Sequence, residues 1–492
     1  MMDNLGNRVA RSGAWVFSIR LVHQVFYLGR LIILARLLAP KDFGLMGIAL
    51  LTWMTLETFS QTGFQEALIQ KKENTKDYLD AAWTFLIIRG FLLFSIIILI
   101  APSVAVFFET PGAKEIVQAI GLAILIQSFT NIGVVYFQKE LEFNKQFIYI
   151  TAGTITDFTV AVTAAILMRS VWALLLGLLA GKLAQLIVSY VVHPYRPRFR
   201  LEWNKARELF KFGKWIFGSS IIYFLLFQGD DIFVGKIMGA AALGFYQLAY
   251  KISNTPATEI TKVVSQVTFP VYSKIQDNLS TLKEFYLKSL QLISFLSFFL
   301  AGLIFAFAPE FTRFVLGEKW IPIIPIIQAL SIFGVTCAVN GVSGPIFQGI
   351  GKPKVNTIGA LFQFIFLVLL IYPFTIKWGL LGTSIAIAIP NFFYMVFINK
   401  LVSNKLKYKY LNFIKLILIP FLGSLMMVFI IIMMKNFVDS SIIGLLFSFI
   451  VGLGFGLFVT YILDKSIYFN LRYLMFSITS EKKQLKVLLY DK

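Results

Sequence analysis

The sequence predicts an all-α integral membrane protein with 14 transmembrane helices, built as two pseudo-symmetric six-helix bundles followed by two extra C-terminal helices. Composition is the first reason, because 58% of the residues are hydrophobic, only 14% are charged and the mean hydropathy is +0.78. A soluble domain carries about 25% charged residues. The other two reasons are the number of apolar runs and a repeat within the chain.

Each predicted helix is an apolar run long enough to cross a hydrocarbon core, which requires about 20 residues. The runs cover roughly residues 13–39, 43–66, 81–107, 116–137, 147–168, 171–191, 214–238, 241–272, 285–308, 321–348, 355–376, 378–399, 411–434 and 442–463. Short polar or basic segments separate them. The alternation predicts a chain embedded in a bilayer over nearly its whole length.

The repeat relates residues 11–49 to residues 211–249 without a gap, with seven identities in 39 positions. The identical pairs are Gly13/Gly213, Trp15/Trp215, Phe17/Phe217, Gly29/Gly229, Ile32/Ile232, Gly44/Gly244 and Ala49/Ala249. Repeated membrane helices are typical of secondary transporters, whose substrate sites lie between the copies. Because each copy has an even number of helices, both have the same orientation, and the pseudo-twofold axis is expected to run along the membrane normal.

The repeat also predicts the domain organisation. We expect an N-terminal six-helix bundle at 1–192, a basic cytoplasmic linker at 193–213, a C-terminal six-helix bundle at 214–402, helices 13 and 14 at 403–464, and a cytoplasmic tail at 465–492. The linker carries closely spaced basic residues and an amphipathic pattern, which is typical of a segment lying on a membrane surface.

The loop charges predict the orientation. Alternate loops place 29 lysines and arginines on one side and 8 on the other, and basic loops remain in the cytoplasm. Both termini are therefore expected in the cytoplasm. The formal net charge of +20 is then mainly a signal for topology, and we expect no nucleic-acid partner. No cleavable leader precedes the first apolar run, so that run is expected to remain as an anchor.

The sequence contains few of the residues and motifs on which enzyme chemistry depends. Cys337 is the single cysteine, two histidines do not make a conventional zinc site, and the P-loop pattern of nucleotide hydrolases is absent from the sequence. We therefore predict a protein that is not an enzyme and that uses no cofactor or metal.

Charged residues inside the predicted spans are the candidate functional residues, since each costs about 2.5–3.5 kcal/mol at a helix centre on insertion scales. In the first span, Arg20, His23 and Arg30 recur at helical spacing and form a polar stripe. In the eighth span, Lys251, Glu259 and Lys262 share a face, and a mutual Glu259–Lys262 ion pair is the alternative to a ligand site. Pro256 and Pro270 are expected to kink that span, whereas snorkelling towards the interface accounts for Arg36 and Lys415.

Two adjacent carboxylates in the seventh span, Asp230 and Asp231, supply counter-charges. The 200-residue offset makes Arg30 equivalent to Asp230, so the two could meet across the pseudo-twofold axis and latch the outer side. The alternative is a bond of Asp230 or Asp231 within its own half.

We predict that six cations line a central cavity and bind substrate: Arg20, His23, Arg30, Arg89, Lys251 and Lys262. We predict gating or ion-coupling roles for four acids: Asp230, Asp231, Glu259 and Asp157. A cation-rich cavity suits a phosphate-bearing substrate.

Five strings carry a resemblance to a known family: LARLLAPKDFG at 34–44, TGFQEALIQK at 62–71, QKELEF at 138–143, DIFVGKIMG at 231–239 and LGFY at 243–246. Together they resemble the Wzx-type flippases of O-antigen and exopolysaccharide in the multidrug/oligosaccharidyl-lipid/polysaccharide exporter superfamily, over about residues 5–465. One departure is Gln138-Lys139, where relatives often have Gln-Arg.

The resemblance implies a flippase that moves polyprenyl-pyrophosphate-linked oligosaccharide across the bacterial cytoplasmic (inner) membrane by alternating access. It also implies contact with membrane lipids and, as pathway partners, a polysaccharide polymerase and glycosyltransferases. Three alternatives remain: an ion-coupled multidrug antiporter of the same superfamily, a peptidoglycan-precursor lipid flippase, and a scaffold of a glycan assembly complex that transports nothing itself.

Overall fold

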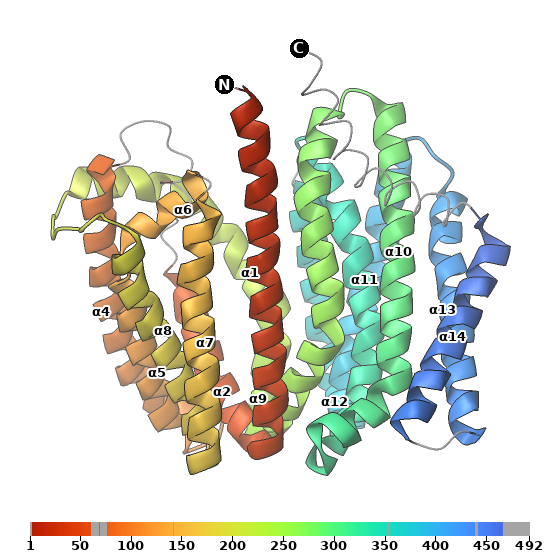
Figure 1. Cartoon of the computed structure of the whole chain (residues 1–492), viewed down its shortest axis with the longest axis horizontal. Helices are drawn as coiled ribbons and strands as arrows, with labels where there is room; N and C mark the ends of the chain where they lie inside the picture. The colour runs from red at the N-terminus through yellow and green to blue at the C-terminus, as the bar shows by residue number, and fades with distance from the viewer. Residues whose placement is uncertain are drawn as a thin grey trace. The chain divides into compact units, whose positions relative to one another are not determined.

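The computed structural model of the chain describes residues 2–60, 68, 76–140, 142–352, 354–437 and 441–465, and all regular structure among them is helical (Figure 1). The first helices are α1 (Met2–Leu37), α2 (Pro40–Phe59), α4 (Lys76–Phe107), α5 (Ala113–Ser128), α6 (Val135–Lys139), α7 (Phe143–Met168) and α8 (Trp172–Val192). The later helices are α9 (Trp203–Lys274), α10 (Leu279–Glu310), α11 (Ile324–Gly349), α12 (Lys354–Lys405), α13 (Tyr410–Phe437) and α14 (Ile442–Leu463). Short η helices occupy Ile132–Val134, Phe311–Leu316 and Glu318–Ile323.

Two of these helices are too long for one crossing. α12 has 52 residues, which would extend about 78 Å if straight, against a hydrocarbon core of about 30 Å. It is broken at Gly379 and the 72-residue α9 is broken at Gly239, both with positive φ, a conformation that favours glycine. Gly239 lies between the predicted spans 214–238 and 241–272, and Gly379 lies two residues after the predicted boundary at 377.

The predicted span at 116–137 is not one straight helix. α5 and the segment Ile132–Lys139 meet at 71°. Asn131 explains the break, because its Oδ1 accepts a hydrogen bond from the Gly133 backbone nitrogen at 2.9 Å and starts a new helix. Its backbone nitrogen donates to Ser189 Oγ at 3.0 Å, and its Nδ2 donates to the Tyr195 carbonyl at 2.7 Å. The bend is therefore fixed by contacts with α8 and the following linker.

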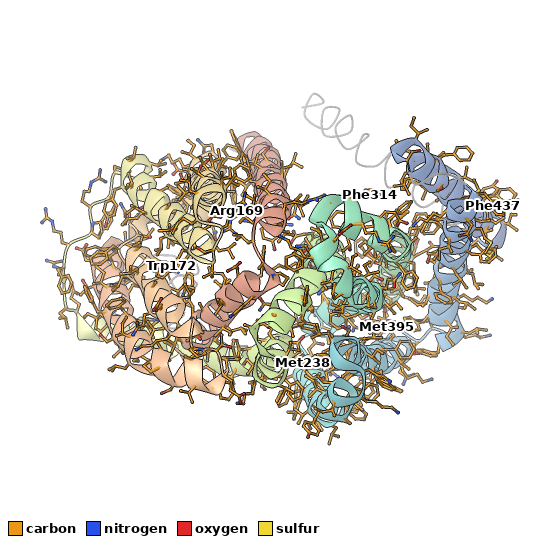
Figure 2. The ribbon with its side chains drawn as sticks, turned by 90° about the horizontal axis from the view of Figure 1, so that it is seen from below. Arg169, Trp172, Met238, Phe314, Met395 and Phe437 are labelled. Carbon is orange, nitrogen blue, oxygen red and sulfur yellow. The ribbon has the colours of Figure 1, made fainter. Side chains whose placement is uncertain are left out.

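The protein is a multi-pass membrane protein. Ten of the described helices are long and apolar enough to cross a membrane, or eleven if the bent pair forms one span. Large apolar side chains cover the outside of the helices, and most of the outer side-chain atoms in Figure 2 are carbon. Leu99 is 76% exposed, Leu167 78% and Phe437 84%. Such exposure is compatible with lipid and not with water.

The chain forms two compact units. Unit 1 contains residues Met1–Gln247 and Val315–Trp320, and unit 2 contains Leu248–Phe314 and Ile321–Lys492. In unit 1, α7 packs against α1 and α8, while α5 packs against α2, α4 and α8. In unit 2, α11 packs against α10 and α12, and α13 packs against α10 and α14. The bundle boundaries at 192 and 214 derive from the repeat and stay a prediction.

Unit 1 contains one carboxylate that connects two helix starts. Asp42, in the first turn of α2, accepts a hydrogen bond from the Ala39 backbone nitrogen at 2.9 Å through Oδ2. Its Oδ1 accepts another from the backbone nitrogen of Val171, the residue before α8, at 3.1 Å. Unpaired backbone N–H groups at helix starts favour such acceptors. Asp42 thereby fixes the start of α2 against that of α8.

Candidate functional site

A row of charged side chains lies inside the helices of unit 1, starting between α1 and α7. Arg30 Nε is 3.0 Å from Asp157 Oδ2, and Arg30 Nη2 donates to the carbonyl oxygen of Leu174 on α8 at 3.2 Å. The two charged side chains are 21% and 26% exposed. α1 is held against α7 here by the edge-to-face contact of Phe26 with Phe158 at 5.3 Å. The pair is thus positioned by apolar packing on both helices.

Two glycines of α8 make room for Asp157. A Cβ at Gly177 would lie 2.7 Å from Asp157 Oδ1, and a Cβ at Gly181 would lie 2.8 Å from Asp157 Cβ. Small residues let membrane helices approach closely. The next residue, Lys182, reaches over the ring of Trp53 on α2 at 5.6 Å. Lys182 also interacts electrostatically with the carboxylates of Glu57 and Asp157, and so connects the two ends of the row.

The row ends in a second ion pair between α2 and α4. Arg89 Nη2 lies 3.0 Å from Glu57 Oε1. The same guanidinium donates to Ser60 Oγ at 2.8 Å and to the Glu57 carbonyl oxygen at 3.3 Å. Arg89 therefore closes the C-terminal end of α2 as well as neutralising Glu57.

We call Arg30, Asp157, Lys182, Glu57 and Arg89 the charged row. It contains three cations and two carboxylates, contributed by five helices. Ionisable groups inside membrane helices face protein or water and mark substrate or ion paths. The excess positive charge favours an anionic ligand such as a phosphate, with Lys182 as the cation outside the two direct pairs.

Of the other predicted cations, His23 interacts electrostatically with Asp157 of the charged row. On α1, Arg20 is half-buried, and His23 is exposed and stacks on Tyr27 at 6.2 Å. Lys251 and Glu259 are half-buried on α9, in unit 2. The side chain of Lys262 lies outside the described residues. The structure thus brings Arg30, Arg89 and Asp157 into one row and leaves the ligand role of the others as a prediction.

The predicted Arg30–Asp230 pair is wrong for this structure. Asp230 is 4% exposed and its Oδ2 accepts a hydrogen bond from the Tyr246 hydroxyl at 2.6 Å. Asp231 Oδ2 accepts one from Gln247 Nε2 at 3.0 Å. Both bonds stay within α9, as the alternative expected. The reason is that α1 packs on α7, so Arg30 meets Asp157 instead.

The two copies of the repeat touch each other at their equivalent corners. A Cβ at Gly44 would lie 1.6 Å from the carbonyl oxygen of Ala240, and a Cβ at Gly244 would lie 2.0 Å from the carbonyl oxygen of Pro40. Residues 40 and 240 are equivalent, as are 44 and 244, so the contact is reciprocal. Reciprocal contacts are the signature of a twofold axis. We call these four residues the corner contact; they lie at the start of α2 and directly after the break in α9 at Gly239.

A short segment, Val315–Trp320, fastens the end of α1 beside the corner contact. Lys319 Nζ donates to the carbonyl oxygens of Arg36 at 2.8 Å and Leu38 at 2.6 Å, and Trp320 Nε1 donates to that of Ala35 at 2.8 Å. Arg36 Nε donates in return to the Val315 carbonyl at 2.7 Å. The last carbonyls of a helix have no partner within it, and cations there are favourable. Arg36 is thus bonded to protein, whereas snorkelling was expected.

The segment is anchored by an aromatic cluster. Trp320 is 0% exposed and packs edge-to-face with Phe43 at 5.3 Å and with Phe245 at 5.6 Å. Phe43 belongs to the first copy of the repeat and Phe245 to the second. The indole therefore lies between both copies and closes this end of unit 1.

One further ion pair, on the same predicted outer side, connects the second copy to the turn after α4. Lys236 Nζ of α9 lies 2.7 Å from Glu109 Oε1 in the turn after α4, and over the ring of Phe107 at 5.5 Å. The hydrogen bond and the positive charge of Lys236 lower the pKa of Glu109. Glu109 is therefore ionised at neutral pH, as the pair requires.

The start of the predicted linker is docked on the opposite side of unit 1. Asp80 Oδ1 accepts hydrogen bonds from the Tyr195 hydroxyl at 2.6 Å and from the Arg198 backbone nitrogen at 2.8 Å. His193 Nδ1 accepts one from the Tyr195 backbone nitrogen at 3.2 Å. Burial, and the nearby positive charge of Lys145, lower the pKa of His193, so that it is neutral at pH 7.

Several residues of this arrangement were not predicted as functional. Lys182 and Glu57 are single charges within predicted spans and belong to no motif, and Trp320 and Lys319 gave no sequence signal. The identity of Gly44 and Gly244 in the repeat was the signal for the corner contact. In the described part of the chain, no group of three His, Cys, Asp or Glu side chains could hold a metal ion.

Sequence comparisons find a protein family and several relatives that this chain resembles. The pattern of the family described as "Polysaccharide biosynthesis protein" matches residues 33–325. The lipopolysaccharide biosynthesis protein WzxC of Escherichia coli (strain K12) is 26% identical over 375 residues, covering 75% of each chain. A membrane protein in the cps region of Klebsiella pneumoniae is 26% identical over 423 residues, covering 83% of this chain and 85% of that protein.

Among solved structures, the chain is similar to the lipid II flippase MurJ in an inward closed conformation. The TM-score is 0.75 at 15% sequence identity, covering 94% of this chain and 99% of that one. At this level of identity the likeness concerns the fold, which agrees with the predicted fold class.

Proposed function

Because the chain belongs to the polysaccharide biosynthesis protein family, we propose that it is a flippase that moves polyprenyl-pyrophosphate-linked oligosaccharide from the inner to the outer leaflet of the bacterial cytoplasmic membrane. The oligosaccharide and pyrophosphate lose their hydrogen bonds to water in hydrocarbon, so unaided crossing has a prohibitive barrier. A polar path within the protein removes that barrier. No covalent step is involved.

The charged row is the observation that carries the proposal. Its three cations lie within apolar helices, where an unused charge is costly, and two of them are balanced by carboxylates. Lys182 provides the excess positive charge for a pyrophosphate. A multidrug antiporter for organic cations would be served better by an acidic excess. Arg20, His23, Lys251 and Lys262 are proposed to extend the cationic lining, and Asp230, Asp231 and Glu259 to act in gating or ion coupling.

Alternating access is proposed to operate through the corner contact. In this structure the two copies meet at Gly44 and Gly244, and Val315–Trp320 fastens the end of α1. We propose that this end faces outward, and that release of the glycan requires the corners to separate. Both termini are then cytoplasmic, and a polymerase and glycosyltransferases of the same pathway are the proposed partners.

Replacement of Lys182 tests the transport function. In a strain lacking the native gene, Lys182→Met should raise the share of lipid-linked glycan on the cytoplasmic leaflet at least tenfold, because the apolar stem remains and the charge is lost. The glycan on each leaflet is measured with an impermeant glycosidase, and Lys114→Met, an exposed lysine on α5, is the matched control. Wild-type export by Lys182→Met at equal expression would refute the role of the charged row.

Reconstitution separates a transporter from a scaffold. Purified protein alone in liposomes should move a fluorescent polyprenyl-pyrophosphate glycan between leaflets. A scaffold would show the rate of empty liposomes. The topology is tested in a Cys337→Ala background, where a cysteine at Lys114 should react with an impermeant thiol reagent outside cells and one at Lys405 should not.

A further inference from the structure

Unit 2 contains a groove of about 620 Å³ between the starts of α10 and α13 and the end of α14. It is lined by side chains from the first four turns of α10, the first three turns of α13, and the end of α14 with the residue after it. All three helix ends lie on the side that the loop charges predict to be cytoplasmic. α13 and α14 fall outside the repeat, so the proposed alternating movement of the two copies does not account for them.

Three lysines and two carboxylates line the groove, so its lining has a net positive charge. Lys288 is paired with Glu284 at 2.8 Å, and Asp464 accepts a hydrogen bond from Gln291 Nε2 at 2.9 Å. In the described part of the chain, no carboxylate lies within ion-pair distance of Lys283 on α10 or Lys415 on α13. Two ammonium groups on opposite walls therefore face a shared space.

Beside the polar Ser280 and Asn412, the remaining wall is apolar. Leu287 on α10, Leu416 and Ile419 on α13, and Leu463 on α14 line it. Leu411 and Leu418 on the neighbouring faces of α13 are 55% and 46% exposed, so apolar surface continues from the groove to the lipid-facing outside. A groove lined by both lysines and apolar side chains fits an amphiphile better than a soluble ion.

We propose that this groove binds an anionic glycerophospholipid of the cytoplasmic leaflet, with its phosphate between Lys283 and Lys415 and an acyl chain along the apolar wall. Anionic lipids are attracted by lysines at this depth. Lys415, placed in an otherwise apolar span, thereby acquires an anionic partner. The lipid would join the α13–α14 pair to α10, which makes it a structural ligand of unit 2, independent of the charged row in unit 1.

The proposal is tested on the full-length protein in detergent, by native mass spectrometry and by the melting temperature with added lipid. Phosphatidylglycerol should bind and raise the Tm, while phosphatidylcholine should do so far less. Each lysine near a membrane surface contributes about fivefold to the affinity for an anionic lipid. Lys283→Ala with Lys415→Ala should therefore weaken phosphatidylglycerol binding about 25-fold, and Lys405→Ala with Lys409→Ala, two exposed lysines outside the groove, should leave it unchanged.

Other outcomes would overturn the proposal. They are a double variant that binds phosphatidylglycerol like the wild type, a Tm shift produced equally by inorganic phosphate, and a shift produced by polyprenyl pyrophosphate but not by phosphatidylglycerol. The last would make the groove an entry site for substrate. Lys283→Gln with Lys415→Gln provides a second variant if the alanine pair does not fold, and it is judged by the same binding ratio.

Discussion

Adding one methyl group at the corner contact should separate the two copies. An ordinary carbon–oxygen contact is about 3.4 Å, while the Cβ of Gly44→Ala would lie 1.6 Å from the Ala240 carbonyl oxygen, so the corners must move apart by about 1.8 Å. Overpacking of this kind costs about 1–3 kcal/mol. The closed arrangement should thus lose about 5- to 150-fold in population relative to an open one.

Spin-label distances measure this shift directly. Labels at Lys114 on α5 and Met238 on α9, in a Cys337→Ala background, report the separation of the copies on the predicted outer side. Gly44→Ala and Gly244→Ala should each add a longer distance. Gly229→Ala is the matched control, because nothing lies within 4 Å of a Cβ there and the gain in helix propensity is the same. Wild-type distances in both corner variants would refute the reasoning.

Three further predictions concern individual contacts. Arg30→Gln should lower the free energy of unfolding by about 3 kcal/mol, seen as a lower Tm, because Asp157 loses its direct ion pair. Combining Arg30→Gln with Asp157→Asn should recover most of this loss, whereas additive effects of the two substitutions would contradict the pairing. Trp320→Phe keeps an aromatic ring but loses the donor to the Ala35 carbonyl and part of the buried indole volume, so the Tm should fall by the equivalent of at least about 1 kcal/mol. Trp378→Phe, at an exposed position, should change the Tm far less. The pKa of His193 is lower when residues 193–200 are docked than when they are free, so the undocked segment takes up a proton at a higher pH. Docking should therefore be complete above a pH of about 6.5 and weaken as the pH falls below that value. Hydrogen exchange of that segment should show this, and His193→Gln should remove the pH dependence; equal dependence in both would refute it.

The apolar runs predicted where helices lie, with boundaries at Gly239 and two residues before Gly379, because hydropathy acts locally. Partners of buried charges depend on which helices pack together, and this was not predictable from spacing. From its spacing alone, Arg30 could pair with Asp230 or with Asp157, and it pairs with Asp157 because α1 packs against α7. The Val315–Trp320 segment was missed for the same reason, since its bonds go to carbonyl groups that every residue has.

At the corner contact the two copies meet as the two subunits of a symmetric homodimer do, although they belong to one chain. In an isologous interface each type of residue is used twice, once on either side of the axis, so the same side chain must satisfy both roles. Glycine does so at 44 and 244, whereas Arg30 and Asp230 face different neighbours and have no reason to match. The identity of Gly44 and Gly244 therefore reflects a contact that both copies share, whereas the difference between Arg30 and Asp230 reflects partners that each copy has on its own.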